Sequence, residues 1–344
     1  MADQRNGGII WCTETWNPIR ARNRSGKQEG ILPFGWHCER VSEACRNCYA
    51  DAMNAMRGTG LPYARPSRDD VEIYLDEKTL LQPLHWRRPK KIFVCSMTDL
   101  FGEWVPDWMI DRIYAVTALC PQHIFQALTK RPERMRDYII TRGGDWGTYL
   151  PAALISVGLG ARRGLAAKVC VSWPPPNVWL GVTVENQKAA DERIPILIDT
   201  PAALRWISAE PLLGPIDLTF LRQPNDGGGQ WWLDALRSDR GGWFSDEAAT
   251  DPMDDELARY HIKGRLDWVV AGGESGPQAR PTHPDWAWSL RDQCAAADVP
   301  FLWKQWGDWA SVNQPENGAL VMESRPRHWF PDGKEHNAFP EVNT

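Results

Sequence analysis

The chain has 344 residues, of which 43% are hydrophobic and 24% charged, a composition typical of a folded protein with an apolar core. No stretch approaches the roughly 18 apolar residues that a membrane-spanning helix needs, and the N-terminus shows no basic region followed by an apolar one. We therefore expect a cytoplasmic protein without a membrane partner. The formal net charge of −5 differs from the basic excess usual in a dedicated duplex-DNA binder.

Six short runs rich in apolar and β-branched residues predict strands buried on both faces, as in a parallel sheet. They are residues 90–101, 123–132, 177–187, 203–213, 266–276 and 300–309. Helical patterns occupy 106–120, 186–200 and 283–299, and Pro195 should end or kink the second of these. Alternation of strand and helix predicts an α/β fold, either a barrel or a doubly wound sheet.

Two stretches interrupt this alternation. Residues 141–176 contain Gly-Gly and Pro-Pro-Pro, and residues 219–265 contain Gly-Gly-Gly and many acids. Both predict loop-rich insertions between βα units and not separate domains. The expected organisation is one α/β domain over 1–310, followed by an irregular C-terminal tail over 311–344.

Basic clusters lie at 20–27, 85–91 and 129–136, and the chain has 20 tryptophans. We interpret the clusters as solvated surface. Tryptophan rings either stack on bases or fill a core, and the sequence does not separate these two uses.

Polar residues follow the predicted strands at their C-terminal ends. The series is Ser96, Thr98 and Asp99; Thr129, Lys130 and Arg131; Glu185 and Asn186; Glu210; and Gly272, Gly273, Glu274 and Ser275. In (β/α) barrels this end of the strands is the active-site face. Each residue taken singly also suits a turn or a helix cap, but the recurrence favours a site.

Eight cysteines in a chain of this length do not suggest a disulfide scaffold. Three of them, Cys38, Cys45 and Cys48, form a C-x6-C-x2-C group upstream of the first predicted strand. A close-set group of cysteines in a reducing compartment indicates metal binding or catalysis.

Three interpretations of this group compete. A structural zinc normally takes four ligands, and His37 or Cys12 could be the fourth, although neither has the usual finger spacing. A redox C-x-x-C pair would leave Cys38 without a role. A 4Fe–4S cluster held by three cysteines leaves one iron open for a substrate or cofactor. The spacing favours the cluster over zinc and leaves both open.

Several long motifs occur in an order that resembles a known family. They are WNPIR (16–20), CERVSEACRNCYA (38–50), FVCSMTDLF (93–101), LTKRPERM (128–135), NVWLGVTVENQ (177–187), ADERIPIL (190–197), SAEPLLGPIDL (208–218), WVVAGGESG (268–276) and FLWKQWGDW (301–309). They resemble the phage-associated three-Cys-motif family, which is similar to radical S-adenosylmethionine (SAM) enzymes of the spore photoproduct lyase-like branch. The resemblance covers most of 9–218 and 266–310.

The resemblance implies a partial (β/α)6 radical SAM-type barrel with the two loop-rich insertions. Cys38, Cys45 and Cys48 would ligate a 4Fe–4S cluster, and SAM would chelate the remaining iron and yield a 5′-deoxyadenosyl radical. Most radical SAM enzymes use C-x3-C-x2-C, so here the ligation is carried over from the family and not from that common motif.

The resemblance also implies SAM-binding positions. Tyr49 corresponds to an aromatic residue near the adenine. Ser96, Thr98 and Asp99 resemble the position that hydrogen-bonds the SAM amino group, to which a carboxylate and hydroxyls are suited. Lys130 matches a lysine that pairs with the SAM carboxylate.

Further residues have less direct counterparts. Glu185 and Arg193 are candidates for ribose or carboxylate contacts, and Glu210 for contact with the substrate. Gly272 and Gly273 occur too late in the chain to be the familiar SAM-binding Gly-Gly-Glu tripeptide. We expect them to allow a close backbone approach to adenine or substrate.

The family's phage context implies a nucleobase, nucleotide or DNA substrate, with phage DNA modification as the role and the host cytoplasm as the location. Cys95 is a candidate hydrogen-atom donor in that chemistry. An external electron donor such as flavodoxin or ferredoxin is expected, and a partner protein is possible. Two alternatives remain: a non-catalytic iron–sulfur or zinc-binding phage protein, and a photoproduct-lyase-like DNA repair enzyme.

Overall fold

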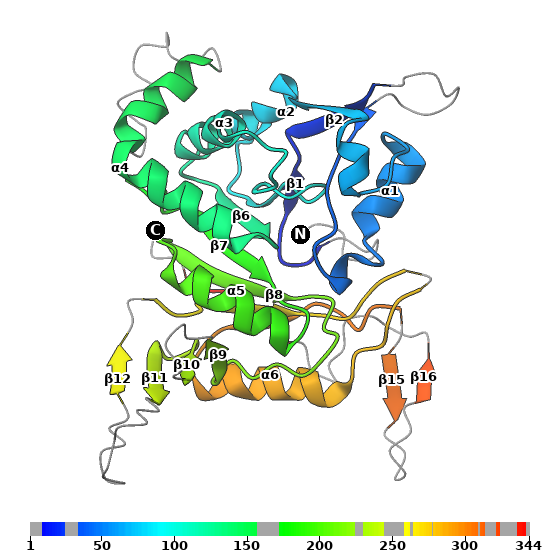
Figure 1. The fold of residues 1–344 in the computed structure, drawn as a ribbon, viewed down its shortest axis with the longest axis vertical. Coiled ribbons are helices and arrows are strands. Elements are labelled where there is room, and N and C mark those ends of the chain that lie inside the picture. Colours follow the sequence, from blue (N-terminus) through cyan, green and yellow to red (C-terminus); the bar gives the residue numbers. More distant parts are fainter. Residues whose placement is uncertain are drawn as a thin grey trace. The chain divides into compact units, whose positions relative to one another are not determined.

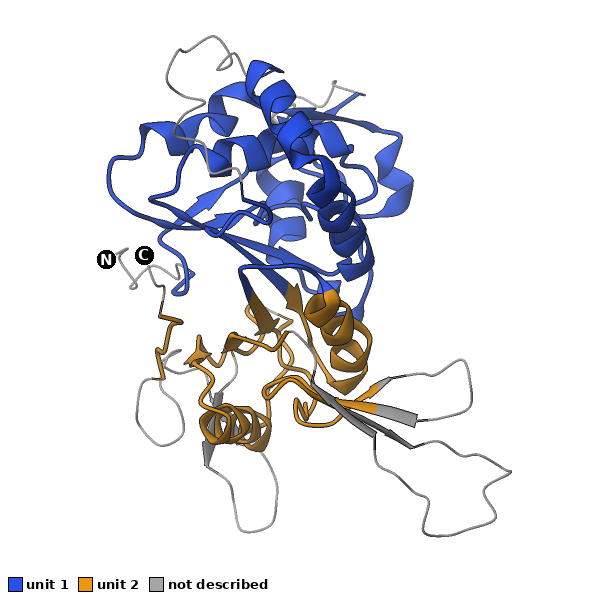
Figure 2. Ribbon diagram, turned by 90° about the vertical axis from the view of Figure 1, so that its left-hand side faces the viewer, with its two compact units in different colours: residues 1–181, 200–204 blue, residues 182–199, 205–344 orange. Residues whose placement is uncertain are grey.

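The computed structural model describes residues 9–24, 34–156, 172–223, 230–243, 258–261, 264–276, 278–308, 310–313, 321–323 and 336–341. The chain divides into two compact units, coloured separately in Figure 2. The first unit comprises residues 1–181 and 200–204, and the second comprises 182–199 and 205–344.

The principal sheet has seven parallel strands in the order β1-β5-β6-β7-β8-β13-β14. Their bounds are β1 Glu14–Trp16, β5 Lys91–Val94, β6 Ile124–Thr129, β7 Val178–Thr183, β8 Leu204–Ala209, β13 Trp268–Ala271 and β14 Phe301–Trp303. The spatial order follows the chain order throughout, whereas a doubly wound sheet reverses at a switch point. The fold is therefore mixed α/β and consistent with a partial, barrel-like arrangement.

All six predicted strands and all three predicted helices are present. Strands β7 and β13 are buried at every residue, as their near-continuous hydrophobicity predicted. Among the described residues five tryptophans are fully buried, and all five lie on strands of the principal sheet, Trp16 on β1 and the others on β7, β8, β13 and β14. At least these rings fill the core and are not available to stack on bases.

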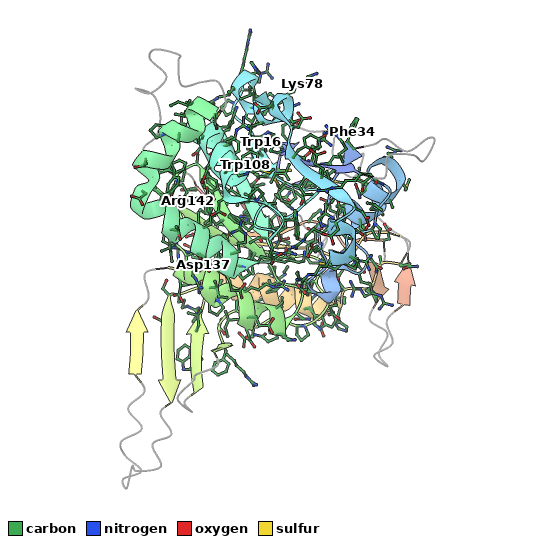
Figure 3. The ribbon with its side chains drawn as sticks, turned by 45° about the horizontal axis from the view of Figure 1, so that its top comes forward. Trp16, Phe34, Lys78, Trp108, Asp137 and Arg142 are labelled. Carbon is green, nitrogen blue, oxygen red and sulfur yellow. The ribbon has the colours of Figure 1, made fainter. Side chains whose placement is uncertain are left out.

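Helices α3 (Asp107–Ala118) and α4 (Pro132–Ser156) lie side by side in the first unit (Figure 1). The Arg142 side chain on α4, labelled in Figure 3, donates from Nε to Asp111 Oδ1 at 2.7 Å, and the Tyr138 hydroxyl donates to the same oxygen. These bonds connect the two helices through one buried carboxylate.

The expectation that a loop-rich insertion begins at residue 141 is wrong for residues 141–156, which continue α4 beyond a kink at Asp145. Trp146, Leu150 and Leu154 are buried at a spacing of four residues, which supports a helix against the effect of nearby glycines and Pro151. The rest of that predicted insertion up to residue 171 lies outside the described residues.

A three-stranded antiparallel sheet precedes β5 in the first unit, in the order β3-β2-β4. It consists of β2 Ile19–Asn23, β3 Phe34–Gly35 and β4 Val71–Leu75. Short helical segments follow or flank it: η2 Glu43–Cys45, α1 Tyr49–Arg57, η3 Arg65–Arg68, α2 Glu77–Leu80 and η4 Gln82–His85. The apolar runs did not predict this sheet, because its strands alternate buried and exposed residues.

The second unit contains α5 (Gln187–Asp199) and α6 (Pro284–Ala296). Pro195 lies inside helix α5 and is buried, so it does not end the helix, which was one of the two outcomes expected of it. No helix among the described residues is long and apolar enough to cross a membrane.

The second predicted insertion and the tail contain regular structure that we did not predict. Residues 219–265 form an antiparallel sheet ordered β12-β11-β10-β9, with β9 Leu221–Gln223, β10 Gln230–Asp234, β11 Asp239–Trp243 and β12 Ala258–His261. Strands β15 (Ala310–Asn313) and β16 (Val321–Glu323) pair antiparallel. Residues 224–229, 244–257, 262–263, 314–320, 324–335 and 342–344 of these predictions lie outside the described residues.

Residues 336–338 lie along the outer side of β14. Trp303 N donates to His336 O at 2.8 Å, and Ala338 N donates to Phe301 O at 3.1 Å. Leu302 and Asn337 form an antiparallel bridge. Part of the predicted irregular tail therefore covers the edge of the principal sheet.

Candidate functional site

The three close-set cysteines lie on one connection in the first unit. Cys38 follows β3, Cys45 ends η2, and Cys48 is the N-cap of α1. All three are free thiols and partly buried. Cys38 and Cys48 pack with Trp36 against the buried cluster of Ala50, Tyr63 and Met97.

The thiols are near enough to influence one another. Burial raises the pKa of Cys38 most, and charge on Asp99, Cys48 or Cys45 raises it further. Within the described residues, no three His, Cys, Asp or Glu side chains converge as placed on a point that could hold a metal ion. The donors fit a thiolate-ligated centre in kind and number, and ligation would require the thiols to turn toward one point.

Cys45 has the most favourable surroundings for a thiolate. Burial would raise its pKa, but the Lys130 ammonium and hydrogen bonds from the backbone at Val41 and Ser42 outweigh burial and lower it. The pKa of Cys48 stays raised by burial, although a backbone hydrogen bond from Asp51 and the charge of Lys130 oppose the shift. Because metals bind thiolates and not thiols, the charge of Lys130 would favour ligation at both positions.

Lys130 is an unpaired cation beside these thiols. It directly follows β6, and its backbone N donates to Asp99 Oδ2 at 3.1 Å. Its ammonium makes no hydrogen bond or ion pair with any described residue. It is partly exposed, so this charge is available to an anionic ligand.

The Asp99 carboxylate is buried and fully engaged within the protein. Oδ1 accepts from Thr129 Oγ1 at 2.7 Å and from Phe101 N at 3.0 Å. Oδ2 accepts from Lys130 N and from Arg131 Nη1, each at 3.1 Å. These four bonds use the capacity of a carboxylate, so Asp99 connects the ends of β5 and β6 and has no lone pair left for a ligand's amino group.

Thr98 and Ser96, which the resemblance also implied as SAM-binding positions, likewise make hydrogen bonds within the protein. Thr98 Oγ1 donates to His37 O and accepts from Trp104 Nε1 at 3.3 Å. The hydroxyl of Ser96 pairs with the side-chain amide of Asn17, whose Nδ2 lies at 3.0 Å.

Tyr49 is tied to the same strand end. Its hydroxyl donates to Ser96 O at 2.8 Å, and the side chain is half exposed. An exposed ring fixed at its hydroxyl can still offer a face to an adenine. Of the carried-over residues, Tyr49 and Lys130 are the two that lie beside the thiols with a surface accessible to a ligand.

Arg131 belongs to the strand-end series, but the sequence assigned it no particular role. Its guanidinium donates to Asp99, to both Glu103 oxygens at 3.2 and 3.0 Å, and to Glu39 O at 3.1 Å. It also lies 4.6 Å from the centre of the Trp104 ring. Because Glu39 directly follows Cys38, the bond from Arg131 to Glu39 O fixes the backbone next to Cys38 at the end of β6.

Tyr63 was also not assigned. Its hydroxyl donates to Met97 O at 2.6 Å, and its backbone N donates to Asp51 Oδ1 at 2.9 Å. Burial raises its pKa, and charge on Cys38 and Cys48 raises it further. No sequence motif singled out Tyr63, because its contacts come from segments distant in the chain.

Cys95 is buried at the end of β5 with a positive φ of 57°. Its backbone N donates to Trp16 O at 2.8 Å, and a backbone hydrogen bond from Ile19 reaches its thiol. Burial raises its pKa. These contacts place Cys95 against β1 and β2, and they give no support to a hydrogen-donor role.

In the second unit, Glu185 and Arg193 pair with each other. Arg193 Nη1 donates to Glu185 Oε2 at 2.9 Å and to Thr183 O at 2.7 Å, and both side chains are buried. The pair connects the end of β7 to α5. This mutual satisfaction explains both residues without a ribose or a SAM carboxylate.

Glu210 forms an ion pair with Lys304, and each side chain is 16% exposed. Both residues follow strands of the second unit, β8 and β14. The pair remains partly accessible, so Glu210 is still a candidate for substrate contact.

Gly272 and Gly273 allow a close backbone approach, as expected, but the approaching group belongs to this chain. A Cβ on Gly273 would lie 1.9 Å from Trp306 O, and one on Gly272 would lie 3.3 Å from Gln305 O. Gly273 N donates to Gln305 O at 2.7 Å. The contacts explain these glycines by packing of β13 against the segment after β14, without adenine or substrate.

These observations define a mixed α/β protein with a parallel sheet and a loop of three thiols beside an unpaired lysine. A family model described as protein of unknown function (DUF5131) matches residues 6–340. The chain therefore belongs to the DUF5131 family. No curated protein and no solved structure matches it.

Proposed function

We propose that this protein is a radical SAM enzyme that uses a 4Fe–4S cluster and acts on a nucleobase-containing substrate in phage DNA modification. The observation that carries the proposal is the loop of three free thiols beside the unpaired Lys130. When bound, the cluster would supply the electron that cleaves SAM to methionine and a 5′-deoxyadenosyl radical.

The surroundings of the two possible fourth ligands favour a cluster over a closed zinc site. His37 Nε2 pairs with Glu39 Oε1 at 3.4 Å, and the ring lies edge-on to Trp104 at 5.2 Å. Cys12 contacts the backbone of Ile9, with Sγ 3.8 Å from the carbonyl oxygen. A structural zinc needs four ligands, whereas a cluster with an open iron needs only the three thiolates.

Two residues beside the thiols would bind different parts of SAM. Lys130 offers its ammonium to the SAM carboxylate, an opposite-charge contact at a partly buried position. The exposed ring of Tyr49 offers a stacking face to the adenine. Thr98, Asp99 and Arg131 position the loop and do not themselves touch the cofactor.

The substrate assignment rests on the family resemblance, which places nucleobase chemistry in a phage-infected host cytoplasm. A flavodoxin- or ferredoxin-like donor would deliver the electron. A non-catalytic iron–sulfur or zinc protein would not need an unpaired lysine beside its thiols, which favours the enzyme. Photoproduct repair would use the same cofactors but a different substrate. Assays on irradiated and unirradiated DNA therefore distinguish it from DNA modification.

The test is anaerobic reconstitution with iron and sulfide, followed by reduction in the presence of SAM. We expect about four iron atoms per chain and formation of 5′-deoxyadenosine. Changing Cys38, Cys45 or Cys48 to Ala should abolish both, whereas Cys294→Ala, which removes a buried helical thiol, should leave both unchanged. Stable binding of zinc without iron, or a full iron content without 5′-deoxyadenosine, would overturn the proposal.

A further inference from the structure

The outer face of the β3-β2-β4 sheet combines arginines with aromatic rings. In this antiparallel register, Arg20 lies opposite Tyr74, and Arg22 lies opposite both Glu72 and Phe34. Residues directly opposite each other share one face of a sheet. The Arg20 guanidinium lies 4.5 Å from the centre of the Trp36 ring, and that ring packs inward against the buried cluster beside Cys38 and Cys48.

The two faces of this sheet differ sharply in burial. Ile19, Ala21, Val71 and Leu75 are buried beneath it. On the outer face Arg22 is exposed and Phe34 is 45% exposed. Phe34 lies directly opposite Arg22 in the register, so this face presents an exposed ring next to an exposed guanidinium.

The arginines of this face make few hydrogen bonds or ion pairs with the described residues. Arg20 forms no hydrogen bond or ion pair with the described residues, and its Nε is buried without a partner. Arg22 lies 4.8 Å from the centre of the Tyr74 ring and 3.4 Å from Glu72, and both charged side chains are about half exposed. An exposed ion pair of this kind is worth little, so a stronger anion can replace Glu72.

We propose that this arginine–aromatic face, composed of Arg20, Arg22, Phe34 and Tyr74, binds single-stranded DNA. Guanidinium groups neutralise phosphates, and exposed rings stack on unpaired bases, a combination typical of sequence-tolerant single-strand binding. The base faces of duplex DNA are already stacked on one another, so the Phe34 ring could not stack on them.

The choice of DNA rests on the proposed function, in which a DNA base is modified. Such an enzyme needs the base outside the duplex stack, and a face that binds the unpaired strand would present it. The interpretation of residues 20–27 as solvated surface is thereby replaced for Arg20 and Arg22.

The experiment measures fluorescence anisotropy of a labelled single-stranded oligodeoxynucleotide titrated with the full chain. Phe34→Ala should weaken binding by about 5- to 100-fold through lost stacking, and Phe34→Trp should preserve it. Arg22→Ala should weaken binding and make the slope of log K against log salt shallower by about 0.7. Glu72→Gln should tighten binding, a gain that partial misfolding would not produce.

Matched controls come from the helices of the same unit. Trp108→Ala removes a half-exposed ring from α3, and Arg136→Ala removes a partly exposed guanidinium from α4, and neither should alter binding. Figure 3 labels Trp108 and Phe34 on their separate elements. The proposal is overturned if Phe34→Ala behaves like Trp108→Ala, if Glu72→Gln fails to tighten binding, or if duplex DNA or RNA binds as tightly as single-stranded DNA.

The same preparations are assayed for 5′-deoxyadenosine. Formation of 5′-deoxyadenosine without strand binding would overturn this inference alone. Strand binding without 5′-deoxyadenosine by reconstituted protein would overturn the proposed function while supporting the binding face.

Discussion

Two adjacent cations, Lys130 and Arg131, have different roles in the candidate site. The Arg131 guanidinium is buried and bound by Asp99, Glu103 and the backbone of Glu39. The Lys130 ammonium has no partner among the described residues. The sequence presents both as one basic pair after a strand, and only the positions of distant carboxylates decide which cation is available to a ligand.

We predict that Lys130→Met weakens SAM binding to the reconstituted protein about tenfold, or ~1.4 kcal/mol, through loss of one charge-assisted contact. Equilibrium dialysis with labelled SAM measures the affinity. Iron content should change little, since Lys130 is not a ligand.

Lys188→Met is the matched control, because Lys188 is a highly exposed lysine on α5. It should leave SAM affinity unchanged. Equal affinities for wild type and Lys130→Met would show that the ammonium does not contact the cofactor.

His123 provides a prediction about pH. Its ring is buried beside Phe125 and lies with Nε2 3.2 Å from Pro83 O. Burial lowers its pKa, and the charge of Lys90 lowers it further. Below its unfolded value of about 6.5, the folded protein therefore binds fewer protons than the unfolded chain, and the free energy of unfolding falls as the pH falls.

Urea unfolding between about pH 7.5 and 5.5 tests this, with a contribution of at most about 1.4 kcal/mol per pH unit from one group. The slope should be shallower in His123→Gln than in wild type. Identical slopes in the two proteins would mean that His123 takes up its proton equally well when folded.

The strands of the principal sheet were predictable, because burial on both faces produces a long apolar run in sequence. The exception is β1, whose three residues include the polar Glu14 and Thr15. The β3-β2-β4 sheet and the four-stranded sheet β9–β12 were not predicted. In the first of these, alternation of charged and apolar residues over only a few positions resembles a loop.

Positions of the candidate residues were more predictable than their roles. Every polar cluster lies at a strand end, as the sequence indicated. Yet Asp99, Glu185 and Arg193 are satisfied by partners inside the protein, and sequence spacing cannot show whether a carboxylate already has its donors. For the same reason the sequence indicated no role for Arg131, which it placed in a strand-end cluster, and did not single out Tyr63.

The close contact between the end of β13 and the segment after β14 predicts that stability is sensitive to substitution of Gly273. Gly273→Ala would place a Cβ 1.9 Å from Trp306 O, a backbone atom that must shift. We expect a loss of about 1–3 kcal/mol in the free energy of unfolding. Urea denaturation of both the variant and wild type measures it.

Gly272→Ala tests whether the effect is specific to that contact. Its Cβ would lie no closer than 3.3 Å to its neighbours, so the loss should be clearly smaller. A similar loss at both glycines would indicate a general effect of adding a methyl group to this segment.

For the whole molecule, the sheet order β1-β5-β6-β7-β8-β13-β14 has two terminal strands, β1 and β14. The outer side of β14 is covered by residues 336–338. The same segment receives the Trp268 indole, which donates to Ala338 O at 2.9 Å, and Phe339 packs on that ring at 5.1 Å. An uncovered parallel strand is a template for pairing with another chain.

We predict that deleting residues 336–344 lowers stability and causes self-association that increases with protein concentration. Size-exclusion chromatography with light scattering measures the association. Deleting only 342–344 should have no such effect, because residues 336–338 remain to cover β14. A monomeric 336–344 deletion variant at every concentration would argue that β14 is protected by something else.

The dependence of the thiol loop on Asp99 and Arg131 has a consequence for synthesis of the chain. Translation proceeds from the N-terminus, and proteins begin to fold while they are made. Cys38, Cys45 and Cys48 thus leave the ribosome well before the two side chains that fix their loop, and before Lys130 can favour a thiolate at Cys45. Until β6 has been made and has paired with β5, the nascent thiols are open to oxidation and to unwanted metals. Insertion of the proposed cluster would therefore belong to a later stage, after β6 is in place.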